Sequence, residues 1–496
     1  MNKKEPSRPK ARVPRGFADA RAEEIRAREA MLSSIKEVYE LYGFEPLETS
    51  ALEYTDALGK FLPDVDRPEG GVFSLQDDDE QWLSLRYDLT APLARFVAEN
   101  FDALPKPFRR YQFGPVWRNE KPGPGRYRQF YQFDADTVGS ASPAADAELL
   151  MMLADTLEAL GLKRGQYIVK LNSRHLLDGV LDAAQVDPLK RIGVLRAIDK
   201  LDRLKEKGVA ELLGQGRTDE SGDVTKGAQL ESHQVERIMS FLHFTKVARD
   251  WESVKVWLEE TLYGPFGEAG RASAQSILDI AEVLTASGYE ADRIHFDPTV
   301  VRGLEYYTGA VFEAQVTFPV KNEQGETVIF GSVAGGGRYD DLVARFTGQQ
   351  VPATGVSIGV SRLQAALRAL RGQVSLARGP VVVLALDPKS AASAQKMVSE
   401  LRNAGIRAEL YLGSSGMRAQ LKYADRRNSP IAVIEGDDER AKGEVTLKDL
   451  LQGAEMAKTI ESNEAWRKAQ PAQISVPRGK LVEEVRAMLE RQKARG

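Results

Sequence analysis

Two arginine-bearing strands flank a proline-glycine turn in the segment 116–136, VWRNEKPGPGRYRQFYQFDAD. Side chains alternate between the two faces of a strand, so the second strand divides by parity. One face carries Arg126, Arg128, Phe130, Gln132, Asp134 and Asp136, and the other carries Tyr127, Gln129, Tyr131, Phe133 and Ala135. The first face suits a ligand with anionic, flat and amine-bearing parts, because guanidinium groups bind phosphates, rings stack on bases and carboxylates hold ammonium groups.

Three other segments carry similar side chains at strand positions. These are Asp88 and Thr90 in LRYDLTAP, Arg302, Tyr306 and Tyr307 in VVRGLEYYTGAVFEA, and Arg362 in GVSIGVSRL. The glycine run in AGGGRYDDL lacks the lysine of a phosphate-binding loop, so its glycines are expected to let a strand or a substrate pass close by. Together the segments predict a sheet lined with arginines, tyrosines and carboxylates; an ordinary salt-bridged sheet surface is the alternative.

The surrounding pattern predicts the elements that would position these residues. An amphipathic helix is expected at about 19–42, where apolar residues recur at helical spacing, namely Ile25, Leu32, Ile35, Val38 and Leu41. VFSLQ and QWLSLRYDLT flank the acidic DDDE and predict a hairpin whose tip is a solvated turn rather than a metal site. From about 176 to 288 the pattern is almost wholly helical, with a glycine-rich break at GQGRTDESGDVTKG. Strands then resume.

Apolar runs alternate with helices at βαβ spacing from Val381 onward, after the linker RGQVSLARG. We therefore expect an α+β core with a mixed, mainly antiparallel sheet and a helical insertion, followed by a C-terminal α/β domain. The expected boundaries are a flexible leader at 1–13, a core at 14–183 and 289–372, an insertion at 184–288 and the C-terminal domain at 380–496.

The composition narrows the class of protein. The 496 residues contain no cysteine, which excludes disulfides and thiolate zinc sites, and the four histidines lie at no metal-ligand spacing. No run approaches 18 uninterrupted apolar residues, so no membrane span is expected. The basic N-terminus has no apolar stretch of the secretory kind. A cytoplasmic protein is the expectation.

Charge is spread unevenly along the chain. Residues from Val374 onward carry 21 Lys and Arg against 16 Asp and Glu, whereas residues 1–373 carry 47 against 56. A basic C-terminal module on an acidic body favours a polyanionic partner, although ordinary surface variation would give the same totals.

These segments resemble the class II aminoacyl-tRNA synthetases, and specifically the histidyl-tRNA synthetases, from Pro14 to the C-terminal domain. YGFEPLETSALE resembles the first class II motif, which implies a homodimer interface. The hairpin at 116–136 resembles the second motif, and GVSIGVSRL the third. VRGLEYYTGAVFE and GGGRYDDL resemble signatures specific to histidyl enzymes.

The resemblance implies a role for each matching residue. Histidine would be bound by Asp88, Leu89, Thr90, Arg118, Gln132, Asp136, Arg302, Tyr306 and Tyr307, and ATP by Arg118, Glu120, Phe130 and Arg362. Arg118 would grip the α-phosphate, Phe130 and Arg362 would sandwich the adenine, and Arg302 would reach both the α-phosphate and the carboxylate of histidine. Arg118 and Arg302 are the expected catalytic residues. ATP would carry Mg²⁺, whose protein ligands the sequence does not assign.

The implied reaction needs no protein nucleophile, because the carboxylate of histidine attacks the α-phosphorus itself. Histidine would then be transferred to the 3′-terminal ribose of tRNA(His). The C-terminal domain would bind the anticodon end. Candidate tRNA contacts are Arg126 and Arg128 in the hairpin and Arg418, Lys422, Arg426 and Arg427 in GSSGMRAQLKYADRRNSP, for which a solvated helix face is the alternative.

Two features depart from the pattern of many bacterial relatives. The turn of the second motif is KPGPG where a Gln and a Lys are common, so the usual reading of the extra 5′ nucleotide of tRNA(His) is not assumed. Asp88 stands where a Glu is common, which keeps the carboxylate.

Two other classes of protein compete with the ligase. A regulatory paralogue, such as the synthetase-like subunit of ATP phosphoribosyltransferase, would sense histidine, but it normally lacks the C-terminal domain and the arginine of RGLEYYTG. A nucleic-acid-binding module would leave the tyrosine-carboxylate pocket unexplained.

Overall fold

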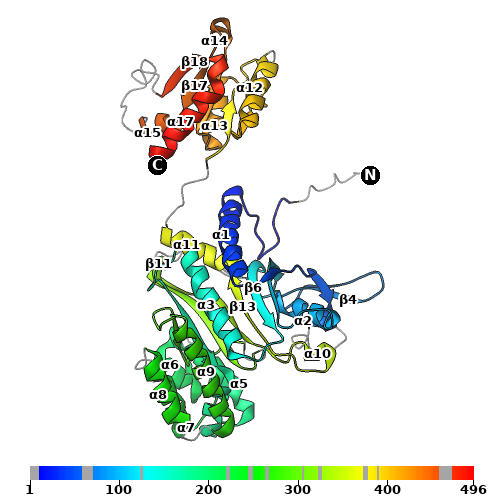
Figure 1. Ribbon diagram of the computed structural model, residues 1–496, viewed down its shortest axis with the longest axis vertical. Coiled ribbons are helices and arrows are strands. Elements are labelled where there is room, and N and C mark those ends of the chain that lie inside the picture. The colour runs from blue at the N-terminus through cyan, green and yellow to red at the C-terminus, as the bar shows by residue number, and fades with distance from the viewer. Residues whose placement is uncertain are drawn as a thin grey trace, which may run out of the picture. The chain divides into compact units, whose positions relative to one another are not determined.

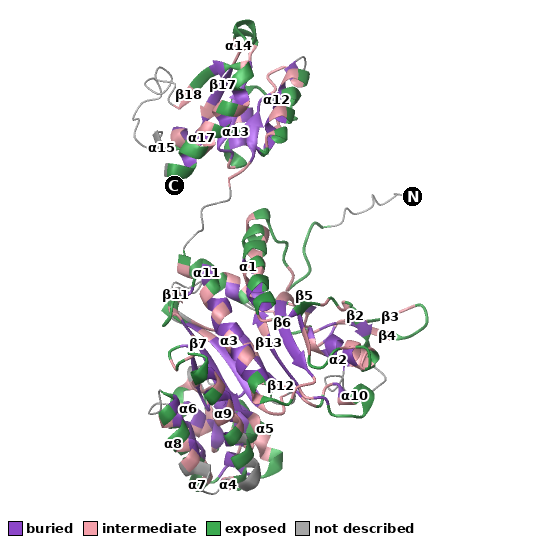
Figure 2. Ribbon diagram, viewed as in Figure 1, coloured by how far each residue is buried: buried purple, intermediate pink, exposed green. Residues whose placement is uncertain are grey.

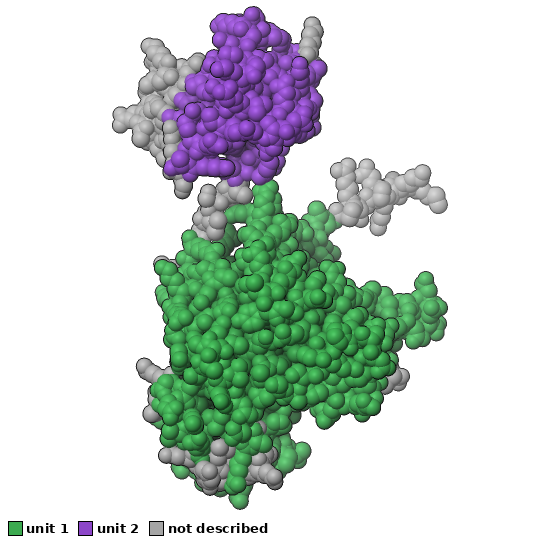
Figure 3. Space-filling view, viewed as in Figure 1, with its two compact units in different colours: residues 1–372 green, residues 373–496 purple. Residues whose placement is uncertain are grey.

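The computed structural model describes residues 10–58, 71–122, 127–218, 224–243, 250–262, 267–303, 307–321, 327–371, 378–387, 390–456 and 472–495. The chain divides into two compact units, residues 1–372 and residues 373–496 (Figure 3). Each unit has its own sheet and its own buried apolar clusters.

An eight-stranded, mainly antiparallel sheet is the frame of the first unit (Figure 1). In spatial order its strands are β1 (Glu45–Pro46), β5 (Phe108–Trp117), β6 (Gln129–Val138), β13 (Ala353–Gly359), β12 (Thr327–Arg338), β11 (Ala310–Lys321), β7 (Tyr167–Ser173) and β10 (Ile294–Phe296). Only the outer pairs, β1 with β5 and β7 with β10, run parallel. The mixed, mainly antiparallel core expected from the sequence is confirmed, and it places β6 directly beside β13.

Helices cover one face of this sheet and bury its apolar side chains (Figure 2). They are α1 (Ala22–Leu41), α3 (Pro143–Ala159) and α11 (Val360–Arg371). The Ser142 hydroxyl caps α3 by accepting a hydrogen bond from the Ala144 amide at 3.3 Å, and a proline follows at the first helical position. The helix expected at 19–42 is α1, and Gly43 follows it with a positive φ of 76°, which glycine adopts without strain.

A three-stranded sheet precedes α2 (Thr90–Glu99) in the sequence. In spatial order its strands are β2 (Leu52–Tyr54), β4 (Trp82–Leu85) and β3 (Ser74–Gln76). The acidic DDDE is the turn between β3 and β4, as expected. Asp77 Oδ1 closes it by accepting hydrogen bonds from the amides of Asp79 and Gln81 at 3.0 and 2.8 Å. Among the described residues no group of three or more His, Asp or Glu side chains is arranged to hold a metal ion.

The segment after β7 is helical, with one short hairpin. Its helices are α4 (Arg174–Ala183), α5 (Arg191–Ile198), α6 (Leu201–Leu213), α7 (Ser232–His243), α8 (Trp251–Leu262) and α9 (Gly267–Ala286). The expected glycine-rich break instead forms a pair of strands, β8 (Gly216–Thr218) and β9 (Val224–Lys226). A Cβ at Gly216 would lie 2.3 Å from the Thr225 carbonyl oxygen, so glycine lets the strands meet. No described helix is long and apolar enough to cross a membrane.

The second unit is a five-stranded sheet flanked by helices. In spatial order its strands are β15 (Ala408–Leu410), β14 (Val381–Val383), β16 (Ile431–Ile434), β17 (Glu444–Asp449) and β18 (Gln473–Pro477), and its helices are α12 (Ala391–Asn403), α13 (Met417–Arg426), α14 (Asp437–Lys442), α15 (Leu450–Met456) and α17 (Leu481–Arg495). The expected βαβ units hold for β14, β15 and β16, which are parallel. The last apolar run differs: β17 is antiparallel to β16, because the six-residue α14 is too short for a crossover.

Candidate active site

The face of the main sheet opposite its helices carries a row of polar side chains. Cross-strand pairing aligns Arg110 with Asp136, and Asp136 with Gly355. The next row aligns Gln112, Asp134, Ser357, Gly335, Glu313 and Lys170 across six strands. The odd-numbered Phe133 and Ala135 lie in the apolar core instead. The separation by parity expected from the hairpin is therefore confirmed.

A buried ion pair anchors one end of this face. Arg110, with 0 % of its surface exposed, contacts Asp136 Oδ2 at 2.8 Å and donates to the Leu89 carbonyl oxygen at 2.9 Å. The Tyr339 hydroxyl donates a short hydrogen bond to Asp136 Oδ1. Burial raises the pKa of Asp136, while Arg110 and the Tyr339 hydrogen bond lower it. The carboxylate is thus held in one orientation by two groups, as a pocket selecting a polar ring requires.

Asp88 lies at the N-terminus of α2, beside Leu89 and Thr90. Its Oδ1 accepts hydrogen bonds from the amides of Thr90 and Ala91 at 3.2 and 2.9 Å. Burial raises the pKa of Asp88, and the Ala91 amide and Arg118 lower it. The three expected histidine-binding residues 88–90 therefore lie together, and the carbonyl oxygen of one of them, Leu89, accepts the hydrogen bond from Arg110.

Arg118 and Phe130 face each other at the open end of β5 and β6. The Arg118 guanidinium lies 5.1 Å from the Phe130 ring centroid and donates to the Tyr87 carbonyl oxygen at 3.2 Å. Glu120 is exposed, and its carbonyl oxygen accepts a hydrogen bond from Arg128 Nε at 3.0 Å. This end of the sheet therefore presents a cation stacked on a ring, which suits a nucleotide.

Arg362 lies in the first turn of α11, where the third motif was expected. Its guanidinium is 5.5 Å from the Phe330 ring centroid and donates to the Phe330 carbonyl oxygen at 3.1 Å. Arg118 is the arginine over Phe130. The sandwich of adenine between Phe130 and Arg362 therefore stays a prediction.

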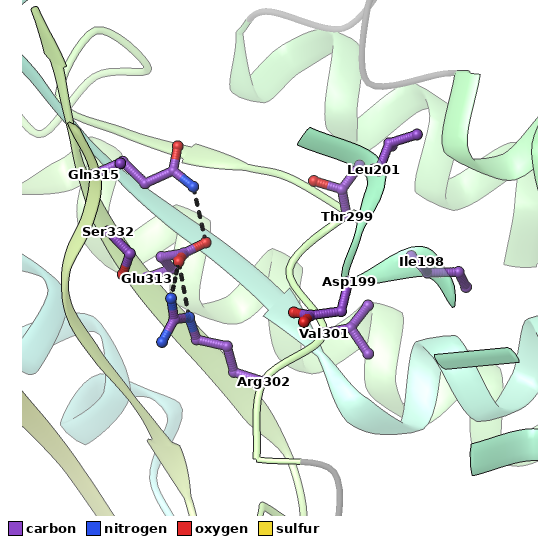
Figure 4. A pocket seen from close by; sticks show the side chains of 10 residues that line it. Ile198, Asp199, Leu201, Thr299, Val301, Arg302, Glu313, Gln315 and Ser332 are labelled. Atoms are coloured by element: carbon purple, nitrogen blue, oxygen red, sulfur yellow. Dashed lines mark hydrogen bonds and ion pairs between the residues drawn. The ribbon is translucent and has the colours of Figure 1, made fainter. Parts of the chain in front are cut away.

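Arg302 forms the wall of a cavity of about 230 Å³ (Figure 4). Arg302 Nε donates to Glu313 Oε1 at 2.8 Å, and Gln315 Nε2 donates to Glu313 Oε2 at 3.0 Å. Asp199 and Leu201 line the side of the cavity toward the helical segment. Glu313 fixes the cation of Arg302 in place. Because 39 % of the Arg302 side chain is exposed, the cation is also accessible from the cavity.

Three glycines form the floor beneath the side chains of this face. A Cβ at Gly335 would lie 3.3 Å from Arg302 Nη1, and one at Gly355 would lie 2.0 Å from Asp136 Oδ1. A Cβ at Gly337 would lie 2.9 Å from the Tyr307 ring. Gly335 and Gly337 thus let side chains lie against the backbone, whereas the close approach of a strand that was expected from AGGGRYDDL is found at Gly336, where a Cβ would lie 2.2 Å from the Gly355 carbonyl oxygen.

Two expected site residues, Arg126 and Tyr306, lie outside the described part of the chain. Tyr307 is described, and burial raises the pKa of its hydroxyl. It is therefore a neutral hydrogen-bonding group at ordinary pH. The sequence reasoning missed six polar residues of this site, which are Arg110, Gln112, Lys170, Glu313, Tyr339 and Ser357. Parity with Arg118 would have indicated Arg110, since the two are eight residues apart on one strand face.

Helix α13 in the second unit carries the other predicted contacts. Arg418, Lys422 and Arg426 recur at intervals of four and are exposed, so they lie along one side of the helix. Arg427 differs, because its guanidinium makes two hydrogen bonds of 2.9 Å to Glu409. The exposed cationic stripe consists of the first three.

Comparison with known proteins agrees with this geometry. Residues 16–363 match the family model described as histidyl-tRNA synthetase, and residues 380–488 match an anticodon binding domain. The chain is 57% identical to a histidine–tRNA ligase of Brucella suis over 490 residues, covering 97% of both chains. It is 56% identical to one of Rhizobium meliloti, covering 99% of this chain and 98% of the relative. A solved histidyl-tRNA synthetase from Nostoc sp. PCC 7120 superposes with a TM-score of 0.71 at 26% identity, covering 97% of this chain and 100% of that one. The chain belongs to the histidyl-tRNA synthetase family.

Proposed function

We propose that this protein attaches L-histidine to tRNA(His) at the expense of ATP, in two steps at the polar face of the first unit. In the first step a carboxylate oxygen of histidine attacks the α-phosphorus of ATP, the bond to the bridging oxygen breaks, and pyrophosphate leaves. In the second a hydroxyl of the 3′-terminal ribose attacks the carbonyl carbon of histidyl-adenylate, and AMP leaves. The observation that carries the assignment is that one chain matches both the histidyl family, at 16–363, and an anticodon-binding domain, at 380–488.

The amino acid is bound between the buried carboxylates. Asp88, Thr90 and Gln132 hold its α-ammonium end, beside Leu89, and Asp136, Tyr306 and Tyr307 surround the imidazole. The fixed orientation of Asp136, between Arg110 and Tyr339, supports this assignment. A site that hydrogen-bonds both ring nitrogens rejects other amino acids, because they leave its buried polar groups unpaired.

The nucleotide is bound at the arginine-rich end. Arg118 and Arg302 bind the α-phosphate, Phe130 and Arg362 stack on adenine, and Glu120 lies near its edge. A preorganised cation stabilises charge that develops on the phosphate. ATP enters as its Mg²⁺ complex, since Mg²⁺ commonly binds substrate phosphates and retains several waters.

A histidine-sensing regulatory subunit is the alternative. A solved structure described as an ATP phosphoribosyltransferase regulatory subunit or histidyl-tRNA synthetase, from Bacillus halodurans, shares the fold at 22% identity and a TM-score of 0.63. The anticodon-binding match and the retained Arg118 and Arg302 favour the ligase.

We further propose that residues 184–288 are a helical insertion between the two parts of the catalytic core. We also propose that the enzyme acts in the cytoplasm.

ATP–pyrophosphate exchange with each of the 20 amino acids tests the first step. Exchange with histidine alone, followed by charging of tRNA(His), is the expected result. Folded protein that exchanges with no amino acid would contradict the ligase and favour the regulatory subunit.

The stripe on α13 is expected to bind tRNA. Replacing Arg418, Lys422 and Arg426 with alanine should raise the KM for tRNA(His) and leave histidine-dependent ATP–pyrophosphate exchange unchanged, because activation takes place in the first unit. Each lost phosphate contact should also reduce the slope of log binding constant against log salt by roughly 0.7 to 0.9. Filter binding at several salt concentrations gives that slope.

A matched triple variant controls for net charge. Lys396, Lys480 and Arg486 are exposed elsewhere in the second unit, and replacing them with alanine should leave the KM for tRNA(His) near that of the unchanged enzyme. Equal losses in the two triple variants would contradict a specific stripe and indicate diffuse attraction.

We propose that two copies of the chain form a homodimer through the side that carries the three-stranded sheet. Leu52, Tyr54 and Leu75 on β2 and β3 are exposed in the single chain. Leu52 lies within the segment that resembles the first class II motif, and Tyr54 follows it directly. Sedimentation equilibrium should give about twice the chain mass of 54.8 kDa. Tyr54→Asp should shift the mass toward one chain, and an unchanged mass would place the interface elsewhere.

A further inference from the structure

The side-chain amide of Gln132 is engaged on one side only. Gln132 Nε2 donates to Ser357 Oγ at 2.5 Å, across the β6–β13 pair. Its Oε1 is shielded from solvent and accepts no hydrogen bond within the described structure, although Gln132 lies on the face that we assign to the amino acid. A shielded amide oxygen without a donor is costly, so a donor supplied by a ligand would satisfy it.

The serine that accepts from this amide has a buried carboxylate, Asp134, as its neighbour. It is the direct cross-strand neighbour of Ser357, and 1 % of its surface is exposed. The neighbouring Ser357 hydroxyl lowers the pKa of Asp134, although neither carboxylate oxygen has a hydrogen-bond partner among the described residues. An ionised carboxylate only accepts, and a hydroxyl has one proton. When that proton turns toward Asp134, the lone pairs of Ser357 Oγ are left for the Gln132 amide nitrogen.

We propose that Asp134 and Ser357 form an orientation relay that turns Gln132 Oε1 toward the α-ammonium group of the amino-acid substrate. The proposal rests on the function proposed above, in which Gln132 binds that end of histidine. Asp134 is a positioning residue: its oxygens are shielded from solvent, and it acts through Ser357 and Gln132. With the amide reversed, an NH₂ group would meet the ammonium and repel it.

The protonation of Asp134 controls the relay. A protonated Asp134 can donate to Ser357 Oγ, which frees the serine proton to donate to Gln132 and reverses the amide. Burial and the neighbouring Asp136 raise the pKa of Asp134 to about 8, and Arg110 lowers it. The charged and titratable groups around it are Asp136 on β6, Arg110 on β5, Asp88 and Arg86 before α2, Tyr307, and Tyr39 on α1. The α-ammonium group of bound histidine favours the ionised form, so binding should release a proton.

Kinetics of ATP–pyrophosphate exchange by the full-length enzyme test the relay. Asp134→Asn and Ser357→Ala should each raise the KM for histidine by about 10- to 100-fold, the usual cost of a misdirected buried hydrogen bond. The KM for ATP should stay within about twofold, because the nucleotide is bound at the far end of the face. The double variant should be no worse than the more affected single variant, since both break one chain of contacts.

The pH dependence separates the relay from a packing role. Relative to Asp134→Asn, the unchanged enzyme should lose affinity for histidine as the pH falls from 9 to 6.5, because its Asp134 becomes protonated. Free histidine titrates identically with either enzyme, so the ratio of the two KM values for histidine isolates the effect of protonating Asp134. A ratio independent of pH would overturn the relay.

Stability and a matched control complete the test. Since the raised pKa means that ionised Asp134 destabilises the ligand-free fold, Asp134→Asn should unfold at the same or a higher temperature than the unchanged enzyme at pH 9. Thr137→Val removes a buried hydroxyl from the opposite face of β6 and should leave both KM values unchanged. Parallel increases in the KM for histidine and for ATP, or a lower unfolding temperature for both relay variants, would overturn the proposal. If the enzyme without substitutions shows no ATP–pyrophosphate exchange at all, that result would instead refute the proposed function.

Discussion

Replacing Arg302 with alanine is expected to lower the kcat of histidine-dependent ATP–pyrophosphate exchange by about 10²- to 10³-fold, the typical cost of one preorganised donor to a developing charge. Glu313 holds the guanidinium in place through Nε at 2.8 Å, and Gln315 in turn holds Glu313. The cation is therefore positioned before substrate arrives, and its removal is felt in the chemical step. Steady-state exchange at saturating histidine and ATP measures the effect.

Two further variants sharpen the Arg302 experiment. Arg302→Lys keeps the charge without the planar fork, so it should recover only part of the rate. Gln315→Ala leaves the Arg302–Glu313 pair in place and should cost much less than Arg302→Ala. A higher KM for histidine with an unchanged kcat would contradict the assignment, because it would mean that Arg302 binds substrate and transition state equally.

Replacing Arg110 with methionine is expected to lower the free energy of unfolding by about 3 to 5 kcal/mol, as breaking a buried ion pair from one side generally does. Arg110 is fully buried and lies against Asp136 at 2.8 Å, and it also lowers the pKa of Asp134. Without it the buried Asp136 loses the cation that contacts it, and the nearby Asp134 retains Arg86 as a neighbouring cation. Urea denaturation of the ligand-free protein at pH 8 measures the loss.

The neighbouring Arg109 provides a control for this stability experiment. It points to the other face of β5 and pairs with Glu148 where 29 % of the arginine side chain is exposed, so Arg109→Met should cost about 1 kcal/mol or less. The penalty of Arg110→Met should also shrink as the pH is lowered, because burial already raises the pKa of Asp134 and Asp136 and protonation removes the unpaired charge. Equal penalties for the two variants, or a penalty independent of pH, would contradict the role of Arg110.

The parts of the fold that depend on local spacing could be predicted from the sequence. The period-2 pattern of 126–136 separates polar from apolar faces without any knowledge of the partner strand, and it assigned Gln132 and Asp136 to one face correctly. The helix α1 and the turn at Asp77 follow in the same way from spacing and from side-chain acceptors near backbone amides.

The contacts between distant segments could not be predicted in this way. Tyr339 reaches Asp136 from 203 residues away, and Ser357 reaches Gln132 from 225 residues away. No periodicity encodes which strand becomes the neighbour of β6. The residues that position the site therefore could not be predicted from the sequence, although most of the expected substrate-binding residues could. Arg362 shows the same limit, because its contact with Phe330 depends on the pairing of β12 with β13.

The floor made by Gly335, Gly337 and Gly355 bears on attempts to change the specificity of this enzyme. A floor of bare backbone has no atoms left to remove, so no substitution there can enlarge the pocket. Each can only intrude, and at Gly355 the first carbon already collides with Asp136. A variant that accepts a larger amino acid must therefore gain its space from the walls. A library in which these three glycine positions are randomised should contain mostly inactive variants.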